Sequence, residues 1–339
     1  MIASPETPIG ESPAFLEVLE ATSRIAPLEK PALIVGERGT GKELIADRLH
    51  LLSDRSAQAV LKMNCAAISD TLLESELFGH EAGAFTGASR THHGRFERAD
   101  GGTLFLDELA NTSPLVQEKL LRVIEYGEFE RVGGSKTLAC DVRLIAATNE
   151  DLPRLAAEGK FRSDLLDRLA FDVITLPPLR ERRDDILLLA ERFAIDMSRE
   201  LGREVFPGFS SDAVRSLLSH DWPGNIRELK NVVERCVYRT GPDRPVAEIV
   251  LDPFESPYRP GRTSKANDAE RLQTFPLDLK AAVRDFEIAT IRRALDASRH
   301  NQRKAAEQLS LTYHQLRGYL KKYDILKEGD QRGDASDRR

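Results

Sequence analysis

The feature of the sequence that most restricts its fold is a glycine-rich loop between an apolar run and a helical pattern. The run Ala32–Val35 has the continuous apolar character of a buried parallel strand, and Leu44–Leu52 has apolar residues at helical spacing. The loop between them reads GERGTGKE and has the G-x-x-x-x-G-K spacing of a phosphate-binding loop. Backbone N–H groups of such a loop bind phosphate at a helix N-terminus. The predicted nucleotide-binding residues are Gly36, Glu37, Arg38, Gly39, Thr40, Gly41, Lys42 and Glu43.

Two positions of this loop have separate consequences. Lys42 is placed to reach the β- and γ-phosphates of a nucleotide as a point charge. Glu43 stands where the common motif has a Ser or Thr that meets Mg²⁺, so metal coordination falls to other residues. A glycine-rich turn with a chance lysine is the structural alternative, and the strand and helix on either side disfavour it.

A pair of carboxylates follows another strand pattern. Thr103–Leu106 is a run of four strand-forming residues, and Asp107 and Glu108 come directly after it. At such a position one carboxylate holds Mg²⁺ with its water shell, and the next polarises an attacking water. The alternative is an exposed strand end with two solvated acids. Because a phosphate-binding loop lies upstream, we favour a site of nucleotide hydrolysis.

Two further predicted strands also end in polar residues. The strand predicted in Val60–Cys65 ends at Asn64, and the strand predicted in Val142–Asn149 ends in Thr148 and Asn149. Open α/β sheets bind ligands at the carboxyl ends of their strands, so these side chains are predicted to share one site. The predicted fold class is therefore α/β, with a P-loop and a parallel sheet.

The stretch Gly83–Ala88, which reads GAFTGA, is a small apolar tip bounded by glycines, with Phe85 and Thr86 at its apex. Glycines permit tight or left-handed backbone, and loops on rigid scaffolds often carry function. A hairpin or helix interruption whose Phe packs into the core fits the spacing equally well. The spacing alone leaves these alternatives open.

Three arginines stand at positions that suit an anionic ligand. Arg162 and Arg168 lie six residues apart on one predicted helix, where each alone is most often part of a surface salt bridge. Arg227 lies at the N-terminal end of another predicted helix, where the helix dipole disfavours a cation. An anionic partner explains that placement, and a salt bridge to Asp221 or Glu228 explains it equally well.

The C-terminal part of the chain has the pattern of a helix-turn-helix unit. A polar, proline-containing stretch over 253–276 predicts a linker, and helices are predicted over 277–297, 301–309 and 312–323. In this motif the second helix of the pair enters the major groove. The residues predicted to contact DNA are Arg303, Lys304, Thr312, Tyr313, His314, Arg317, Lys321 and Lys322.

Charge is distributed unevenly along the chain. The formal net charge of −6 argues against general polyanion binding, but residues 299–323 include six basic residues and one acidic residue. This local excess favours DNA binding over the alternative, a three-helix bundle for protein contacts. The three scattered cysteines suit a reducing cytoplasm, and no apolar run is long enough for a membrane helix. A cytoplasmic protein is therefore predicted.

Taken together, these motifs resemble those of the AAA+ bacterial enhancer-binding proteins, the activators of sigma-54 RNA polymerase. The resemblance covers nearly the whole chain, and GAFTGA is close to diagnostic, whereas a P-loop alone is not. A glutamate at position 43 is usual in this family. The matching segments are GERGTGKE at Gly36–Glu43, ELFGHEAGAFTGA at Glu76–Ala88, GGTLFLDE at Gly101–Glu108, FRSDLLDRL at Phe161–Leu169 and WPGNIREL at Trp222–Leu229.

The resemblance implies a domain organisation. It divides the chain into an AAA+ α/β subdomain (1–178), an α-helical lid (179–252), a linker (253–276), a Fis-type helix-turn-helix domain (277–326) and a disordered tail (327–339). Most relatives carry an N-terminal receiver or sensing domain, and the P-loop of this chain begins too early to leave room for one. We therefore expect regulation to come from another protein.

The resemblance also implies roles for individual residues. The nucleotide is ATP with Mg²⁺, and its phosphates are held by the P-loop. Asp107 coordinates the metal, and Glu108 activates the attacking water. Asn64 is the switch residue that pairs with Glu108. The first sensor is Thr148 with Asn149, the arginine fingers that act on the neighbouring subunit's ATP are Arg162 and Arg168, and the second sensor is Arg227. The sigma-54 contact loop consists of Gly83, Ala84, Phe85, Thr86, Gly87 and Ala88.

The partners implied are the sigma-54 RNA polymerase holoenzyme, enhancer DNA and further copies of the chain in a homo-hexamer. Hydrolysis of ATP in such a ring remodels the closed promoter complex to the open one. Within the family the chain looks most like the activators of phage-shock genes, which implies a trans-acting negative regulator of the phage-shock protein A type. An AAA+ protein-remodelling chaperone is the alternative. A DNA-bound repressor with ATP as a structural ligand is disfavoured by the intact Glu108 and finger pair.

Overall fold

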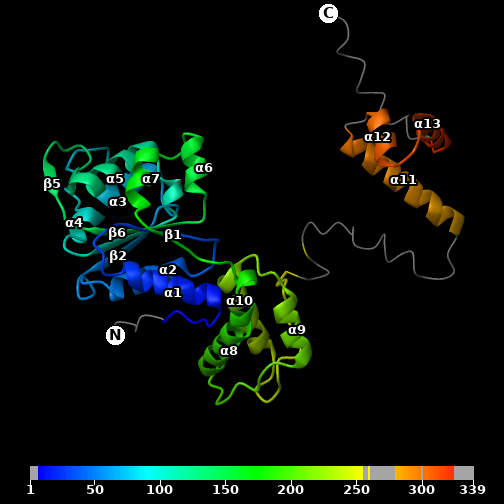
Figure 1. The fold of residues 1–339 in the computed structure, drawn as a ribbon, viewed down its shortest axis with the longest axis horizontal. Coiled ribbons are helices and arrows are strands. Elements are labelled where there is room, and N and C mark those ends of the chain that lie inside the picture. Colours follow the sequence, from blue (N-terminus) through cyan, green and yellow to red (C-terminus); the bar gives the residue numbers. More distant parts are fainter. Residues whose placement is uncertain (1–6, 255–258, 260–278, 299–300, 324–339) are drawn as a thin grey trace, which may run out of the picture. The chain divides into compact units, whose positions relative to one another are not determined.

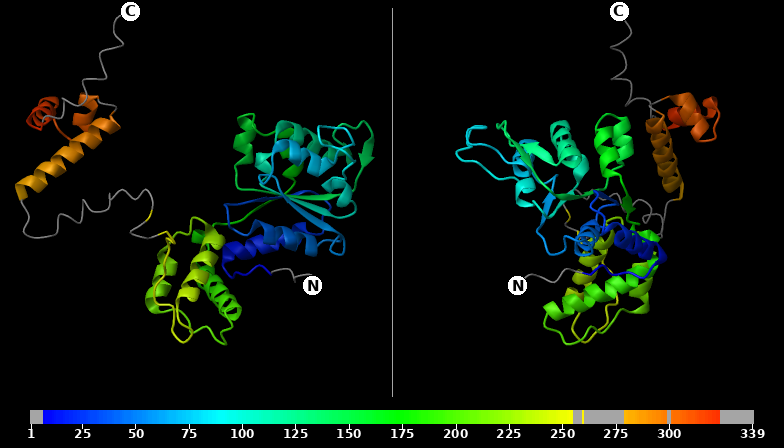
Figure 2. Two further views of the ribbon diagram at one scale, coloured as in Figure 1. Left: turned by 180° about the vertical axis from the view of Figure 1, so that it is seen from behind. Right: turned by 60° about the vertical axis from the view of Figure 1, so that its left-hand side comes forward.

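In the computed structural model of this 339-residue chain, the described residues are 7–254, 259, 279–298 and 301–323. They belong to two compact units, Met1–Pro253 and Phe254–Arg339, and each unit is described by itself. Figure 1 labels the elements of both units, and Figure 2 shows them from two further sides.

A five-stranded parallel sheet lies at the centre of the first unit. Its strand order is β2-β3-β6-β1-β7. The inner strands β3, β6 and β1 are apolar on both faces, as expected for a parallel sheet covered on both sides. This arrangement confirms the predicted α/β class. The strands are β1 (Ala32–Val35), β2 (Val60–Asn64), β3 (Thr103–Asp107), β6 (Arg143–Thr148) and β7 (Val173–Thr175).

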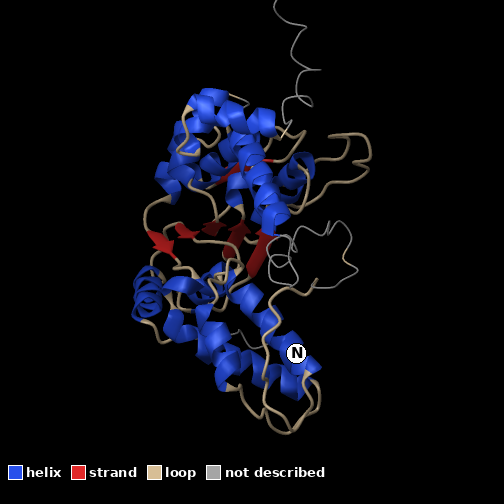
Figure 3. Cartoon of the chain, turned by 90° about the vertical axis from the view of Figure 1, so that its right-hand side faces the viewer, coloured by secondary structure: helices blue, strands red, loops and turns tan. Residues whose placement is uncertain are grey.

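Helices form a layer on each face of the sheet, as Figures 1 and 3 show. One face packs against α1 (Pro13–Ile25) and α2 (Lys42–Leu51). The opposite face packs against five helices and supports a small antiparallel hairpin, β4 (Glu128–Glu130) with β5 (Thr137–Ala139). The five helices are α3 (Asp70–Phe78), α4 (Arg95–Arg98), α5 (Pro114–Tyr126), α6 (Leu152–Ala157) and α7 (Ser163–Leu169).

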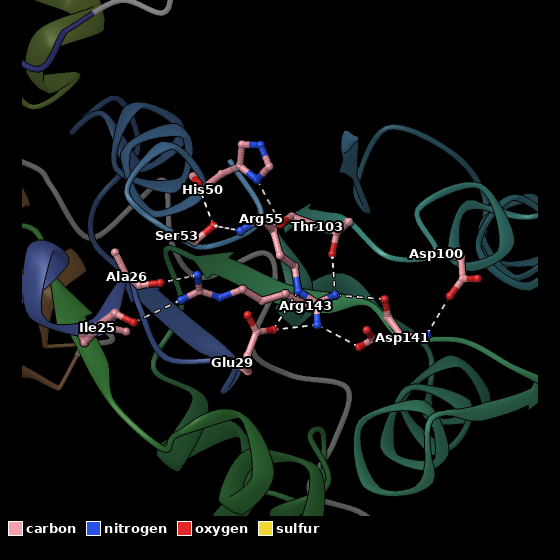
Figure 4. Close-up of polar contacts among 11 residues, drawn as sticks. Ile25, Ala26, Glu29, His50, Ser53, Arg55, Asp100, Thr103, Asp141 and Arg143 are labelled. Atoms are coloured by element: carbon pink, nitrogen blue, oxygen red, sulfur yellow. Dashed lines mark hydrogen bonds and ion pairs between the residues drawn. The ribbon is translucent and has the colours of Figure 1, made fainter. Parts of the chain in front are cut away.

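The amino ends of the strands carry a polar network that joins the two layers (Figure 4). The buried Arg143 side chain donates to the carbonyls of Ile25 and Ala26, at 3.2 and 2.6 Å, and so caps the C-terminal end of α1. Beside it, Arg55 bonds both Glu29 and the Asp141 carboxylate. At the edge of the sheet opposite the P-loop, these polar side chains are thus engaged in contacts that stabilise the fold.

The carboxyl ends of four strands meet at the other edge of the sheet. The strand register pairs Asn64 with Asp107, and Val35 with Thr148. The loop that follows Val35 therefore lies beside the polar ends of its neighbours. This is the edge at which the sequence predicted a nucleotide site.

The lid follows the sheet within the same unit. It consists of a short 3₁₀ turn, η2 (Leu179–Glu181), and the helices α8 (Arg183–Glu200), α9 (Ser211–Ser219) and α10 (Asn225–Arg239). Its core surrounds Trp222, the only tryptophan of the chain, whose indole N–H donates to the Leu217 carbonyl at 2.9 Å. The lid thus has a hydrophobic core of its own.

The second unit contains three helices, α11 (Leu279–Ala297), α12 (Gln302–Gln308) and α13 (Tyr313–Lys322). The predicted tight turn separates the last two. Thr312 caps α13 in a capping box with Gln315. The small core of the unit consists of Ile291, Ala294, Leu295, Ala305, Ala306, Leu316 and Leu320.

The predicted longer helices and strands agree with the observed ones to within about one helical turn. The short helices α4 and α6 were not predicted, because one or two turns carry no readable period. Most of the predicted linker 253–276 and all of the predicted tail 327–339 lie outside the described residues, and the division at residue 178 stays a prediction. Among the described residues, no helix is both long and apolar enough to cross a membrane.

Candidate functional site

The P-loop wraps around the amino group of its own lysine. Lys42 is 8% exposed, and its Nζ donates to the carbonyls of Gly36 and Glu37 at 2.9 and 3.2 Å. Burial lowers the pKa of Lys42, and the nearby carboxylates of Asp107 and Glu108 oppose that shift. Lys42 thus lies between the P-loop and the two carboxylates, where its amino group can bind a phosphate held by the loop.

The lid is fastened to the P-loop by one buried amide. Asn225 accepts a hydrogen bond from Leu179 N at 2.8 Å and donates to the Arg38 carbonyl at 3.0 Å and the Glu37 carboxylate at 3.1 Å. Arg180 holds the same carboxylate through both of its terminal nitrogens, and these bonds lower the pKa of Glu37. These contacts fix the position of the lid relative to the P-loop.

Gly39 permits the closest approach between the loop and the lid. Its φ is +78°, and a Cβ at this position would lie 2.3 Å from the Gly224 carbonyl oxygen. Ile226 N also donates to the Gly39 carbonyl at 3.0 Å. A side chain at position 39 would therefore force the backbones apart.

The two carboxylates at the end of β3 differ in their surroundings. Asp107 accepts from the backbone N–H of Glu108 at 2.9 Å. Glu108 has a left-handed backbone with φ +55°, which is costly for a residue with a side chain and occurs mainly at functional sites. Its carboxylate lies 3.9 Å from Arg38 Nε. The chain therefore directs two oxygen donors of different orientation toward the P-loop.

Asparagines contact both acids. Asn149, with its amide oriented so that the nitrogen faces the carboxylate, donates to both oxygens of Glu108, one of them at 3.0 Å. Asn64 Nδ2 lies 3.5 Å from Asp107. The switch pairing of Asn64 with Glu108 is thus not the contact formed in this structure, and it stays a prediction. Thr148 is fully buried, and its hydroxyl accepts from Glu150 N at 3.0 Å.

The donor set at this edge suits a magnesium ion. Mg²⁺ prefers carboxylate oxygens and usually keeps several waters, so it needs only one or two protein ligands beside the phosphates of its substrate. Asp107 has a carboxylate that could serve as such a ligand. Glu43 is engaged elsewhere, since it pairs with Lys62 at 2.9 Å. Among the described residues there is no cluster of three or more possible metal ligands, so a metal cage built wholly from protein is not indicated.

A cavity of about 620 Å³ opens between the P-loop, the lid and the segment before α1. Its lining combines apolar residues with charged ones, among them Arg192, Asp196 and Lys230. The apolar part suits the base of a nucleotide, and the sequence did not reveal the cavity because its residues come from distant segments. The lining includes Ile9, Leu44, Leu189, Phe193 and Ile226.

A buried ion pair anchors the segment that forms one wall of this cavity. Arg182 and Asp185 are at most 1% exposed and are joined at 2.8 Å. Asp185 also accepts from Glu11 N at 2.6 Å and from both N and Oγ of Ser12, at 2.9 and 2.7 Å. The Arg182 guanidinium lies 3.7 Å above the ring of Phe15. The lid thus fixes the N-terminal wall of the cavity.

The three singled-out arginines have different partners. Arg162 pairs with Asp164 at 2.7 Å, and Arg168 pairs with Glu125 at 2.7 Å. In the described part of the chain, neither guanidinium bonds the P-loop or the β3 carboxylates of its own subunit. Arg227 is exposed, and over the same residues it forms no ion pair. The alternative that Arg227 serves a salt bridge with Asp221 or Glu228 is therefore not what the structure forms.

The GAFTGA tip is a tight, partly exposed turn. Gly83 and Gly87 have φ of +87° and +107°, and Gly83 N donates to the Ala88 carbonyl at 2.7 Å. Phe85 is 38% exposed and packs edge-on against His80 at 4.8 Å, so it does not lie in the core. The right-hand view of Figure 2 shows this region, in cyan, extending away from the sheet.

The base of this loop is tied to the neighbouring β4–β5 hairpin. Arg131 bonds Glu97 at 2.6 Å and Glu81 at 2.7 Å, and the bond from Arg131 lowers the pKa of Glu97 to about 2. Gly133 lies so close that a Cβ there would be 2.7 Å from Ala84 Cβ. The tip therefore rests on the hairpin.

The second unit presents a basic surface around α13. Arg303 and Arg317 each lie 5.9 Å from the centre of the Tyr313 ring. Lys322 is partly engaged, since it lies 3.7 Å from Glu287. The predicted DNA-contacting residues other than the half-buried Tyr313 are exposed; they are Arg303, Lys304, Thr312, His314, Arg317, Lys321 and Lys322.

Three family models match successive parts of the chain. A sigma-54 interaction domain matches residues 8–175, an AAA+ ATPase lid domain matches 180–268, and a bacterial regulatory protein domain of the Fis family matches 282–323. The Psp operon transcriptional activator of Escherichia coli is 60% identical over 319 residues, which cover 94% of this chain and 98% of that protein. The chain belongs to the sigma-54-dependent transcriptional activators.

Other sigma-54 activators and solved structures are similar over most of this chain. The transcriptional regulatory protein ZraR of Salmonella typhimurium is 45% identical over 305 residues, covering 90% of this chain and 66% of ZraR. The crystal structure of NtrX from Brucella abortus in complex with ATP matches with a TM-score of 0.68 and 33% identity, over 94% of this chain and 69% of NtrX. A structure of NtrX with ADP also has a TM-score of 0.68.

Membership of this family decides between the functions left open by the sequence. The chain is a transcriptional activator with an AAA+ ATPase domain, a sigma-54 interaction domain and a DNA-binding helix-turn-helix.

Proposed function

We propose that this sigma-54 activator binds ATP with Mg²⁺ at the carboxyl edge of its sheet and uses hydrolysis to open promoter complexes. The observation that carries the proposal is the convergence of Lys42, Asp107 and Glu108 at the P-loop, from which a cavity of about 620 Å³ opens. The NtrX structure in complex with ATP has the same fold and supports ATP as the nucleotide.

The chemistry of hydrolysis is assigned to the acids at the end of β3. Asp107 would hold Mg²⁺, which neutralises charge on the phosphates when it is bound. Glu108 would orient and deprotonate the attacking water, and Asn149 holds its carboxylate in place. Lys42 would leave the loop carbonyls and bind the β- and γ-phosphates as a point charge.

Hydrolysis is proposed to need a ring. The guanidinium groups of Arg162 and Arg168 pair with carboxylates of their own chain, and we assign them to the ATP of the neighbouring subunit. An arginine finger supplied in this way is worth ~10³–10⁵ in rate. Arg227, exposed on the lid, would contact the phosphates of its own subunit. By likeness to the family, the ring is a homo-hexamer.

The GAFTGA tip is proposed to contact sigma-54 through Phe85 and Thr86. The γ-phosphate would shift Asn64 between a contact with Asp107 and a contact with Glu108. The tip would then move through the segments packed beneath it. Enhancer DNA would be bound by the exposed basic residues of α12 and α13. Lys321 and Lys322 would contact the phosphate groups of the DNA backbone.

Regulation is proposed by likeness to the Psp operon activator. The 60% identity over almost the whole of that relative supports phage-shock genes as targets and a negative regulator of the phage-shock protein A type as a partner. The cytoplasm is the compartment in which these partners meet.

Open-complex formation with purified protein, ATP and sigma-54 polymerase tests the proposal. We expect complexes that require ATP hydrolysis. Thr86→Ala should hydrolyse ATP and fail to open the promoter, because it alters only the tip. Retained activation by this variant would refute the role of the loop. Hydrolysis without open complexes on several sigma-54 promoters would refute the proposed coupling of hydrolysis to promoter opening.

A further inference from the structure

A single buried amide joins the turn after the catalytic carboxylates to the segment that carries Arg162. Gln117 lies on α5 and is 1% exposed. Its Nε2 donates to the Thr112 carbonyl at 2.8 Å and to the Lys160 carbonyl at 3.4 Å. Its Oε1 accepts from the backbone N–H of Arg162 at 2.9 Å. One side chain therefore bridges two segments about 50 residues apart in sequence.

The turn on one side of this bridge is rigid. It begins at Glu108 and continues through the 3₁₀ turn η1 (Leu109–Asn111) to Thr112. Asn111 N donates to the Glu108 carbonyl at 3.0 Å, and Thr112 bonds the Leu109 carbonyl through both N, at 3.1 Å, and Oγ1, at 2.8 Å. The position of the Thr112 carbonyl thus follows that of the Glu108 backbone.

The segment on the other side holds the arginine pair. Arg162 immediately precedes α7, and its extended backbone (φ −75°, ψ 126°) is fixed at N by the bond to Gln117. Arg168 lies in the last turn of the same helix and pairs with Glu125, which is also on α5. Helix α5 therefore contacts both arginines, one through the backbone and one through the side chain.

The chemistry at position 117 requires an amide. An apolar residue would fill the same space but would take this partner from the Arg162 N–H and from the carbonyls of Thr112 and Lys160. A carboxylate would accept from Arg162 N but could not donate to the two carbonyls. A buried amide with every bond satisfied is the arrangement that specifies one relative position of the two segments.

We infer that Gln117 is a positioning residue that couples the hydrolytic turn of one subunit to the arginines this subunit offers to its neighbour. The inference rests on the proposed function, in which Arg162 and Arg168 act in trans. A shift of Glu108 on hydrolysis would move the Thr112 carbonyl, and Gln117 would carry that movement to Arg162 N. Each subunit would thereby report its own nucleotide state to the next.

Mixed rings test this coupling. Gln117→Met removes the three hydrogen bonds at nearly constant volume. Alone, it should bind ATP as the natural protein does and turn over about 10–100-fold more slowly, because catalytic groups misplaced by ~1 Å lose rate of that order. The second partner in the mixture is Glu108→Gln, which cannot hydrolyse ATP but has correctly placed arginines. Where a Gln117→Met subunit receives its arginines from a Glu108→Gln neighbour, turnover at the Gln117→Met site should be restored. A loss of turnover that mixing does not restore would overturn the inference.

Two controls separate this inference from the proposed function. Arg168→Ala mixed with Glu108→Gln measures rescue of the arginine itself. No rescue in that mixture would reject the trans-acting arginines, whereas rescue there and none for Gln117→Met would reject the coupling alone. Leu120→Met changes a buried residue of the same helix and should leave turnover unchanged.

Hydrogen exchange gives a readout that does not depend on the ring. The Arg162 amide should exchange at least about tenfold faster in Gln117→Met than in Leu120→Met, because its acceptor is gone. An unchanged rate would overturn the inference. If Gln117→Met does not fold, Gln117→Glu takes its place, since it loses both donations and is expected to show the same rescue in mixed rings.

Discussion

Replacing Asn225 by alanine should destabilise the first unit by about 3–5 kcal/mol. The change leaves the buried Leu179 N–H without an acceptor, at about 1–3 kcal/mol, and the partly exposed Arg38 carbonyl without a donor, at about 1 kcal/mol. Asn225 also has φ +52°, and alanine in the left-handed region costs about 1 kcal/mol more. Glu37 loses the hydrogen bond from Asn225 but keeps its bonds to Arg180, so this loss adds little to the destabilisation.

Urea unfolding followed by tryptophan fluorescence measures this loss directly. Trp222 is the only tryptophan and is buried three residues from the substitution, so its signal reports the lid. Linear extrapolation gives the free energy of unfolding. Asn225→Gly is the matched control. It loses the same bonds, but it should be about 0.5–1 kcal/mol more stable than Asn225→Ala, because glycine accepts positive φ at some cost in chain entropy. A loss below about 1 kcal/mol for alanine, or no advantage for glycine, would refute the reasoning.

Three further predictions concern the arginines, the loop base and the second unit. Arg168→Ala should bind ATP and lose at least about 10³-fold in turnover, and preserved turnover would contradict its assignment. Glu97→Gln should cost about 1 kcal/mol at neutral pH. Because the folded pKa of Glu97 (about 2) lies below its ordinary value of 4.5, this difference should hold above about pH 5 and shrink as the pH falls toward 2, as acid unfolding of both proteins would show. A pH-independent difference would argue against the Glu97–Arg131 pair. Removing residues 277–339 should abolish specific DNA binding and spare ATP hydrolysis, and undiminished specific binding would contradict the proposed division of labour.

Local patterns in the sequence predicted the scaffold of the site. Ala32–Val35 and Thr103–Leu106 are apolar runs that only a covered parallel sheet accommodates. Because parallel strands end at one edge, the polar residues after them were expected to meet. The structure brings Asn64 to Asp107, and Asn149 to Glu108.

The rest of the site depends on contacts between distant segments, which leave no local signal. Asp185 and Ser12 are 173 residues apart and still form a buried hydrogen bond. Gln117 falls on the buried side of an amphipathic helix, where the pattern alone gives no reason for an amide. Arg227 was compatible with a salt bridge to Glu228, but that carboxylate bonds Gly224 N and His220 instead.

The close approach of Gly39 to Gly224 has a consequence for how this protein can be recombined. A lid transplanted from another family member must bring a backbone turn that fits against the P-loop of its host, and it must also supply the amide that Glu37 and Arg38 accept from. In chimeras divided near residue 178, the lid should therefore dock on the P-loop only when the incoming segment supplies Gly224 and Asn225 or their equivalents. The P-loop and the lid turn therefore have to be exchanged together, although Gly39 and Gly224 are 185 residues apart in the chain.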